Sequence, residues 1–243
     1  MAGVVNLILQ GKGGVGKSVV ATLFAQRLFD LGRPPLCIDT DPVNATFSSY
    51  PKLGAHRFRV TKKGDIDRSN FDLLLERLTS LGDGGHAIVD TGATTFVPLS
   101  TYLLRFEVPS LLKVMGHQLV IHTVIAGGKP QDDTAQGLNT IVRHYDEDVQ
   151  LVVWLNPRFG EILHEGKPFA EWKLYQQHRE RIRALVEMPS IDELATLDLE
   201  QMFRRNQTFV EAFDDPELLL MQRQRLKMVQ RDLYKEIDRA GIA

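Results

Sequence analysis

The sequence predicts an α/β fold, a mostly parallel sheet flanked by helices, and three observations lead to this prediction. Short apolar segments typical of buried strands alternate with helical segments of ten to fifteen residues. Strands and helices that alternate in this way form right-handed βαβ units. A glycine-rich stretch follows the first apolar segment, and acidic residues end the next two. The carboxyl ends of parallel strands meet at one edge of a sheet, where ligands of such folds bind.

The first half of the chain contains three predicted strands and three predicted helices. Continuous apolar runs indicate strands that are buried on both faces. The first helix has apolar residues at helical spacing and ends before Gly32 and two prolines. The strands are predicted at residues 4–10, 36–40 and 86–90, and the helices at 17–31, 71–81 and 97–115, the last interrupted at Pro109.

The second half continues the alternation and then becomes entirely helical. Strands are predicted at residues 118–126, 149–157 and 184–189, and helices at 132–145, at 170–183 and throughout the segment from Ile191 onward. Because no linker separates these segments, we expect one α/β domain over residues 1–190. Residues 191–243 are expected to form a helical C-terminal extension packed on that domain.

Composition narrows the functional classes. The chain of 243 residues is 43% hydrophobic with a formal net charge of -2, so its charge does not indicate DNA binding, although a local basic patch stays open. Cys37 is the single cysteine, which excludes an internal disulfide and fits a cytoplasmic setting. No apolar run approaches the ~20 residues of a membrane span, and the N-terminus lacks the pattern of a signal peptide.

The glycine-rich stretch Gly11–Ser18 matches the phosphate-loop pattern G-x-x-x-x-G-K-[ST]. Glycines let backbone amides surround a polyphosphate, and the following helix adds the positive end of its dipole. Lys17 is expected to neutralise the β- and γ-phosphates, and the Ser18 hydroxyl to ligate Mg²⁺. The expected nucleotide-binding residues of this stretch are Gly11, Lys12, Gly13, Gly14, Val15, Gly16, Lys17, Ser18 and Val19.

Acidic residues follow the second and third predicted strands. Asp39 and Asp41 follow the second, and Asp90 closes the third. A carboxylate beside a phosphate loop can hold Mg²⁺, usually through water, and another can orient the attacking water. Helix capping or turn formation is the structural alternative for each. We expect Ser18, Asp39 and Asp90 to be the metal ligands.

Two further polar residues have a structural and a functional interpretation. Lys12 leaves the loop early, so its side chain is either solvated on the surface or reaches bound phosphate or a facing subunit. Asn156 precedes a proline at the end of a strand. Its side chain either forms a strand-ending turn or pairs with the donor and acceptor edge of adenine.

These residues resemble the MinD/ParA branch of P-loop ATPases. The deviant Walker A motif K-G-G-x-G-K-[ST] is found at Lys12–Ser18, and the second motif, D-x-D-P with N-A-T, at Asp39–Thr46. The third motif is the strand that ends in Asp90. The segment 186–189 resembles the branch's late strand and proline, which passes near the base and makes Pro189 a nucleotide-binding candidate.

The resemblance implies an ATP-dependent homodimer in which Lys12 touches the phosphates bound by the opposite subunit. It also implies that Lys12, Lys17 and Asp41 are catalytic, with Asp41 activating the water, Asp39 near the outer shell of the metal and Asn156 near adenine. One departure concerns Val43, which alone separates Pro42 from the Asn-Ala-Thr triplet, where ParA proteins commonly have Gln and Gly. This loop is shorter by one residue and less polar.

Segments over roughly residues 4–190 also resemble nucleotide-binding proteins of conjugative plasmid transfer regions, among them LILQGKGGVGKS, LCIDTDPVNATF and VVWLNP. The resemblance implies a cytoplasmic, Mg²⁺-dependent ATPase with slow turnover that binds ATP and ADP. It further implies a role accessory to conjugative transfer or plasmid maintenance, with a protein partner from that machinery. A nucleotide-gated assembly module with negligible hydrolysis is the alternative, and a biosynthetic ATP-dependent ligase of related fold is a third.

The segment from Pro216 predicts an amphipathic helix in which Leu219, Leu226 and Leu233 recur every seven residues. Three interpretations stay open: a helix docked on the domain, a partner or dimer helix, and a basic helix on a membrane surface. Acidic residues on its polar face argue against a membrane. The aromatic segment 156–173 is either a lid or a partner loop.

Overall fold

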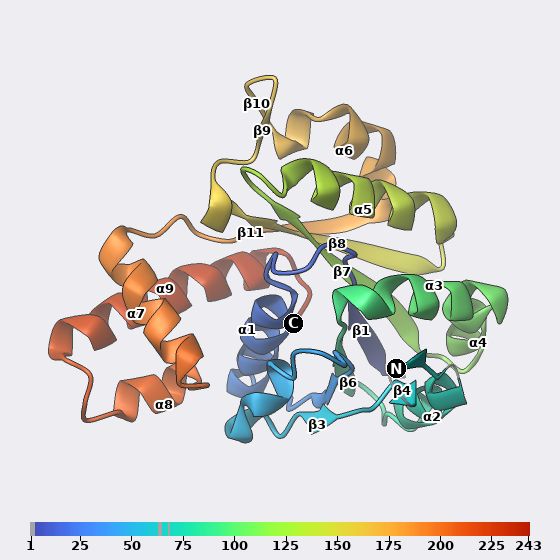
Figure 1. Ribbon diagram of the computed structural model, residues 1–243, viewed down its shortest axis with the longest axis horizontal. Coiled ribbons are helices and arrows are strands. Elements are labelled where there is room, and N and C mark those ends of the chain that lie inside the picture. The colour runs from blue at the N-terminus through green and yellow to red at the C-terminus, as the bar shows by residue number, and fades with distance from the viewer. Residues whose placement is uncertain (1–2, 63–64, 68) are drawn as a thin grey trace.

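A seven-stranded sheet forms the centre of the computed structural model, which describes residues 3–62, 65–67 and 69–243 (Figure 1). Residues 1 and 2, the start of the predicted domain, lie outside this range. The strands are β1 (Val4–Ile8), β2 (Leu36–Asp39), β3 (His56–Arg57), β6 (His86–Asp90), β7 (Gln118–Ala126), β8 (Val149–Asn156) and β11 (Ile182–Glu187). Their order is β11-β8-β7-β1-β6-β2-β3, and every neighbouring pair is parallel. The predicted fold class is therefore confirmed.

Helices cover both faces of the sheet, as the continuously apolar strands require. One face is covered by α1 (Lys17–Asp30) and α9 (Leu220–Arg239), and α7 (Glu193–Arg204) and α8 (Phe209–Asp214) pack against α9 and share its apolar core. The other packs against α2 (Ser69–Thr79), α3 (Phe96–Arg105), α4 (Val108–Val114), α5 (Gln131–His144) and α6 (Lys173–His178). Two small hairpins, β4–β5 (Thr61–Lys62, Asp65–Ile66) and β9–β10 (Leu163–His164, Lys167–Pro168), complete the fold.

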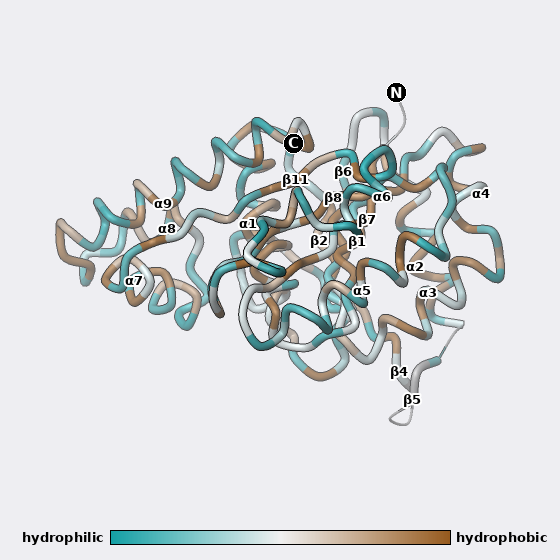
Figure 2. The backbone as a smooth tube through the Cα atoms, turned by 90° about the horizontal axis from the view of Figure 1, so that it is seen from above, coloured by the Kyte–Doolittle hydropathy of each residue, from teal (hydrophilic) through white to brown (hydrophobic). Residues whose placement is uncertain are grey.

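The helices α7, α8 and α9 extend to one side of the sheet in Figure 1, and Figure 2 shows the same projection from above. In Figure 2 the hydrophobic colour gathers along the central strands, whereas the projecting helices alternate between hydrophilic and hydrophobic residues. No helix within the described part of the chain is long and apolar enough to cross a membrane.

Two of the predicted helices differ from the structure. The predicted helix at 170–183 is wrong, because α6 ends at His178 and the chain enters β11 at Ile182. Parallel pairing of β11 with β8 overrides the local helical pattern in this segment. The helix expected at 97–115 breaks at Glu107, whose φ is 50°, and not at Pro109. Pro109 lies in the first turn of α4, where a backbone N–H would have no acceptor within the helix, so the proline costs no hydrogen bond.

The amphipathic C-terminal helix packs on the sheet domain, as one of the three interpretations expected. Leu226, Leu233 and Ile237 are buried along one face of α9, which contacts α1, α7, α8 and β11. Arg27 of α1 donates two hydrogen bonds, of 2.8 and 2.7 Å, to the Asp238 carboxylate. Leu219 does not share this face, since it precedes the helix as its N-cap and is 70% exposed.

A chain of polar side chains crosses the sheet on the α1 side. The indole Nε1 of Trp154 donates to His122 Nδ1 at 3.0 Å, so the remaining proton of a neutral His122 ring is on Nε2. His122 Nε2 lies 3.1 Å from Asn6 Oδ1, and the Asn6 amide donates to the Ala87 carbonyl at 3.0 Å. Burial lowers the pKa of His122 to about 3, which keeps the ring neutral.

Candidate functional site

The glycine-rich loop joins the carboxyl end of β1 to the amino end of α1. Gly14 and Gly16 have φ angles of 72° and 106°, which side chains with a Cβ rarely adopt. A Cβ on Gly16 would also lie 2.9 Å from Asn156 Nδ2. Because α1 begins at Lys17, the free amides of its first turn lie directly after the loop. This geometry suits an anion such as a polyphosphate.

Lys17 turns back over the loop and is largely buried. Its Nζ donates a hydrogen bond of 2.9 Å to the Lys12 carbonyl oxygen, and the residue is 7% exposed. Burial lowers the pKa of this ammonium, while the negative charges of Asp90 and Asp41 raise it. The ammonium group is therefore held at the loop by one neutral acceptor and two nearby carboxylates.

Asp90 lies at the carboxyl end of β6 and is fully buried. Among the described residues, neither of its carboxylate oxygens has a donor in good hydrogen-bond geometry, although the Ser18 hydroxyl lies near enough to stabilise the charged form. Burial raises the pKa of Asp90 to about 7, aided by the charges of Asp39 and Asp41 and opposed by the Ser18 hydroxyl and Lys17. An unpaired buried carboxylate is costly, and a bound cation would remove this cost.

The donor set beside the loop fits a magnesium ion that also binds phosphate. Ser18 and Asp90 supply a hydroxyl and a carboxylate, which are ligands that Mg²⁺ prefers. In the part of the chain that the structure describes, no cluster of three or more His, Cys, Asp or Glu side chains forms a metal site. A cation here would therefore take its remaining ligands from phosphate oxygens and water.

Asp39 and Asp41 lie at the neighbouring strand end, and both carboxylates accept backbone hydrogen bonds. Asp39 is the register partner of Asp90 across β2 and β6. Its oxygens accept from the amides of Asp41 at 3.0 Å and Ser48 at 2.8 Å, and burial raises its pKa. Asp41 Oδ1 accepts from the amides of Val43 at 2.8 Å and Asn44 at 3.1 Å, which is the turn geometry of the structural alternative.

The side chain of Lys12 points away from the phosphate loop and toward α5. Its Nζ lies 2.7 Å from Asp133 Oδ2, and both side chains are about half exposed. The sequence reasoning missed Asp133, although an acidic residue in the first turn of a helix that follows a strand was a usable signal. The pair holds Lys12 at the same edge of the sheet as the loop.

Gln10 is a second residue that the sequence reasoning missed. Its side chain is fully buried and its amide donates to the carbonyl oxygens of Val124 at 3.0 Å and Thr134 at 3.1 Å. Its Oε1 accepts a longer hydrogen bond, of 3.4 Å, from the Lys12 amide. Gln10 therefore ties the start of the phosphate loop to β7 and to the first turn of α5.

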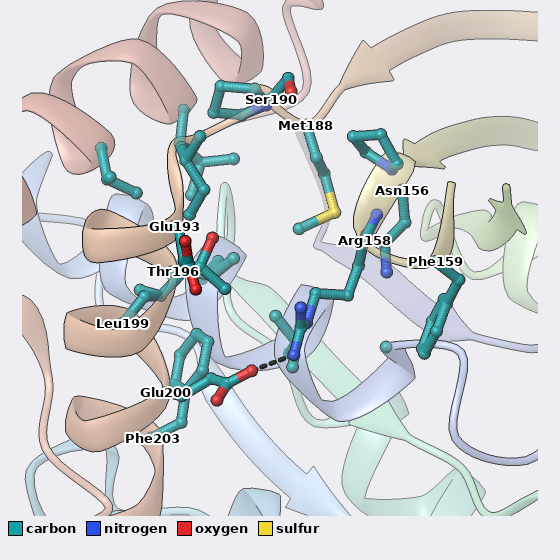
Figure 3. A pocket seen from close by; sticks show the side chains of 18 of the residues that line it. Asn156, Arg158, Phe159, Met188, Ser190, Glu193, Thr196, Leu199, Glu200 and Phe203 are labelled. Carbon is teal, nitrogen blue, oxygen red and sulfur yellow. Dashed lines mark hydrogen bonds and ion pairs between the residues drawn. The ribbon is translucent and has the colours of Figure 1, made fainter. Parts of the chain in front are cut away.

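A cavity of about 510 Å³ opens on the other side of the loop. Gly14, Gly16 and Val19 line it beside Asn156 and Pro189, so the structure brings these predicted residues together. The Asn156 amide donates to the Val15 carbonyl at 3.0 Å, and its oxygen accepts from the Arg158 amide at 3.1 Å. Asn156 thus supports the loop and closes a turn while it also faces the cavity (Figure 3).

The opposite wall of this cavity comes from α7. Figure 3 shows Glu193, Thr196, Leu199, Glu200 and Phe203 of this helix facing Asn156 and Arg158 across the opening. Sequence reasoning expected α7 only as part of a packed extension. A nucleoside attached to a phosphate at the loop would extend into this space.

The parallel sheet, the phosphate loop at its carboxyl edge and the adjoining cavity define a P-loop nucleotide-binding protein. Comparison with known proteins agrees with this class. Residues 7–239 match the CobQ/CobB/MinD/ParA nucleotide binding domain, and the chain belongs to this family. The matched range includes the C-terminal helices.

Two proteins of Escherichia coli, both called Protein TraL, are 43% identical to this chain over 239 residues, which is 98% of this chain and 98% of each relative. A solved structure from Borrelia burgdorferi B31, described as a candidate plasmid partition protein bound to AMPPNP, is similar with a TM-score of 0.50. It is 17% identical and the match covers 98% of this chain and 99% of that one. The resemblances stated from the sequence motifs are confirmed by these matches.

Proposed function

We propose that this protein is a Mg²⁺-dependent switch that binds ATP, hydrolyses it slowly and dimerises in the ATP state. One observation carries the proposal: the phosphate loop, the Lys17 ammonium and the unpaired carboxylate of Asp90 converge at one point of the sheet edge. Such a set of charges suits a triphosphate with its metal ion. Catalysis would consist mostly of positioning and charge neutralisation.

Each residue has a role in this proposal. The loop amides and the start of α1 bind the phosphates, and Lys17 and Lys12 neutralise their charge. Mg²⁺, when bound, would be held by Ser18 and Asp90 with Asp39 in its outer shell, and would offset charge on the phosphate oxygens. Asp41 would orient the attacking water through Oδ2, because the amides of Val43 and Asn44 both donate to Oδ1.

The dimeric state depends on Lys12. The family resemblance implies that this lysine reaches the phosphates of a facing subunit, and in this chain it must then leave Asp133. We expect the Lys12→Ala variant to bind ATP and stay monomeric in light scattering, whereas the wild type dimerises with a non-hydrolysable ATP analogue. A variant that dimerises as the wild type does would contradict the role across the subunit interface.

A nucleotide-gated assembly module with negligible hydrolysis is a second candidate, and the short loop after Asp41 favours it, because a single residue separates Pro42 from Asn44. In this turn Oδ1 of Asp41 accepts hydrogen bonds from two amides, which fixes the orientation of the carboxylate. Phosphate release measured for the wild type and for Asp41→Ala separates the candidates. Release that falls at least tenfold in the variant supports hydrolysis by the wild type. Equal background release from both proteins would favour the module.

By its similarity to the TraL proteins, we propose a cytoplasmic role accessory to conjugative plasmid transfer or plasmid maintenance. The partner would be a protein of that machinery. The net charge of -2 gives no support for DNA as the main partner. Light scattering of the ATP-bound protein with and without DNA tests this directly, and we expect no change on adding DNA.

A further inference from the structure

The two walls of the cavity are joined by an ion pair between side chains that are distant in sequence. Arg158 lies in the short 3₁₀ turn after β8, and Glu200 lies in α7. In Figure 3 the two side chains point toward one another, and the guanidinium Nη2 of Arg158 contacts Oε1 of Glu200. The pair thus connects the α/β domain with the C-terminal extension across the space beside the phosphate loop.

The pair spans the cavity at its open side. The Arg158 side chain is 54% exposed and that of Glu200 33% exposed. Leu23, Phe209 and Leu233 line the same cavity and are buried, so they form its floor. A nucleoside that enters from solvent on this side has to pass the ion pair to reach the floor.

The backbones that carry the two side chains are firmly held. The Phe159–Gly160 backbone packs so closely on the loop after β7 that a Cβ on Gly128 would lie 2.1 Å from the Phe159 carbonyl oxygen. On the other wall, the Asp192 carboxylate caps α7 by accepting from the Ala195 amide at 2.8 Å. Rotation of the two side chains can therefore change the opening of the cavity without a movement of either backbone.

The exposure of the pair indicates how strongly it can act. Exposed ion pairs are screened by water and salt, and their contribution corresponds to a factor of at most about five in an equilibrium constant. Such a pair is too weak to keep the cavity closed permanently. It is strong enough to slow the passage of a ligand two- to fivefold.

We propose that the Arg158–Glu200 ion pair is a strap across the nucleoside cavity that slows nucleotide exchange. This inference rests on the proposed nucleotide-binding function. The strap gives the C-terminal extension a direct part in the site, since α7 supplies the acidic partner. Nucleotide entry and release both require the pair to open, so its removal should raise both rates together.

Nucleotide release tests the strap. Protein loaded with ADP is mixed in a stopped-flow instrument with an excess of fluorescent ADP, whose binding is limited by the release of unlabelled ADP. The variants are Arg158→Gln, Glu200→Gln and their combination. Glu217→Gln is the matched control, because it removes the exposed carboxylate that lies 3.1 Å from Arg205 in the same extension, away from the cavity.

We expect each single variant to release ADP about two to five times faster than the wild type. The double variant should be no faster than the singles, because removal of either partner already opens the strap. Raising the salt concentration should accelerate release from the wild type more than from the variants, so that their rates converge at high salt. Glu217→Gln should release ADP at the wild-type rate.

Three results would overturn the strap. Unchanged release in both single variants would show that the pair does not limit exchange. An effect confined to Arg158→Gln would indicate direct contact between arginine and nucleotide. Effects that multiply in the double variant would mean that the two residues act independently. By contrast, a wild-type protein that binds no ADP would refute the proposed nucleotide-binding function itself.

Discussion

Replacing Asp90 by asparagine should make the nucleotide-free protein more stable while it weakens Mg²⁺-dependent nucleotide binding. The carboxylate is fully buried and, within the described residues, has no donor in good hydrogen-bond geometry; the nearby Ser18 hydroxyl offsets only part of the cost of burial. Its pKa rises from the ordinary value of 3.8 to about 7. At 1.36 kcal/mol for each unit, an ionised Asp90 costs up to about 4 kcal/mol of folding free energy above pH 7.

The sign of the pH dependence follows from proton binding. Between pH 3.8 and 7 the folded protein holds a proton on Asp90 that the unfolded chain releases, so this residue destabilises the fold progressively as pH rises. The neutral asparagine has no such dependence. The stability gained by Asp90→Asn should therefore be largest above pH 7, about 2 to 4 kcal/mol, and should shrink as pH falls toward 4.

Urea denaturation of the nucleotide-free proteins at pH 8 and pH 5 measures this gain. Asp148→Asn, which removes the partly exposed partner of the exposed Lys113, is the control and should change stability by less than about 1 kcal/mol. Calorimetry with ATP and Mg²⁺ then measures the loss of binding. An Asp90→Asn protein that is no more stable than the wild type at pH 8, or whose gain is independent of pH, would refute the electrostatic reasoning.

Two further predictions concern the core around the site. Gly137→Ala should destabilise the protein by about 1 to 3 kcal/mol in urea denaturation, because its Cβ would lie 2.1 Å from Oε1 of the buried Gln10. Gly82→Ala is the control, because a Cβ there meets open space and φ is not positive. The pKa of His122 falls from 6.5 to about 3 on folding, so below pH 6.5 the unfolded chain binds a proton that the folded protein does not, and stability should decrease as pH falls. This decrease is best measured in the Asp90→Asn protein, where the opposite contribution of Asp90 is absent, and a His122→Gln variant with the same pH dependence would contradict it.

The phosphate loop and the central strands were predictable because their signals are local. A loop that presents its amides to an anion needs glycine at fixed positions, and the sequence states those positions directly. The strands β1, β6, β7 and β8 are buried on both faces whatever their neighbours are, so continuous apolar runs identify them. The same reasoning placed Asp39 and Asp90 at one edge, and the structure makes them register partners.

Contacts between distant segments were not predictable from local patterns. The charged segment 170–183 has a helical pattern, but the last residues of this segment pair with the edge of β8 and begin β11. Gln10 meets Thr134 across 124 residues, and Asn156 meets Val15 across 141. The sequence indicated Asn156 as a candidate and gave no signal for Gln10. The hydrogen-bond partners of both residues became visible only in the folded chain.

The sequence alone determined a parallel α/β sheet with an anion-binding loop and acidic strand ends. Residue type and spacing determine which positions adopt a glycine-type backbone conformation and which strands are buried. The tertiary structure alone decided that Asp90 is buried without a donor in good hydrogen-bond geometry, that Lys12 pairs with Asp133, and that α7 forms a wall of the cavity. These features depend on which surfaces meet when the chain packs. That outcome is set by the summed burial of many distant residues and not by any one segment.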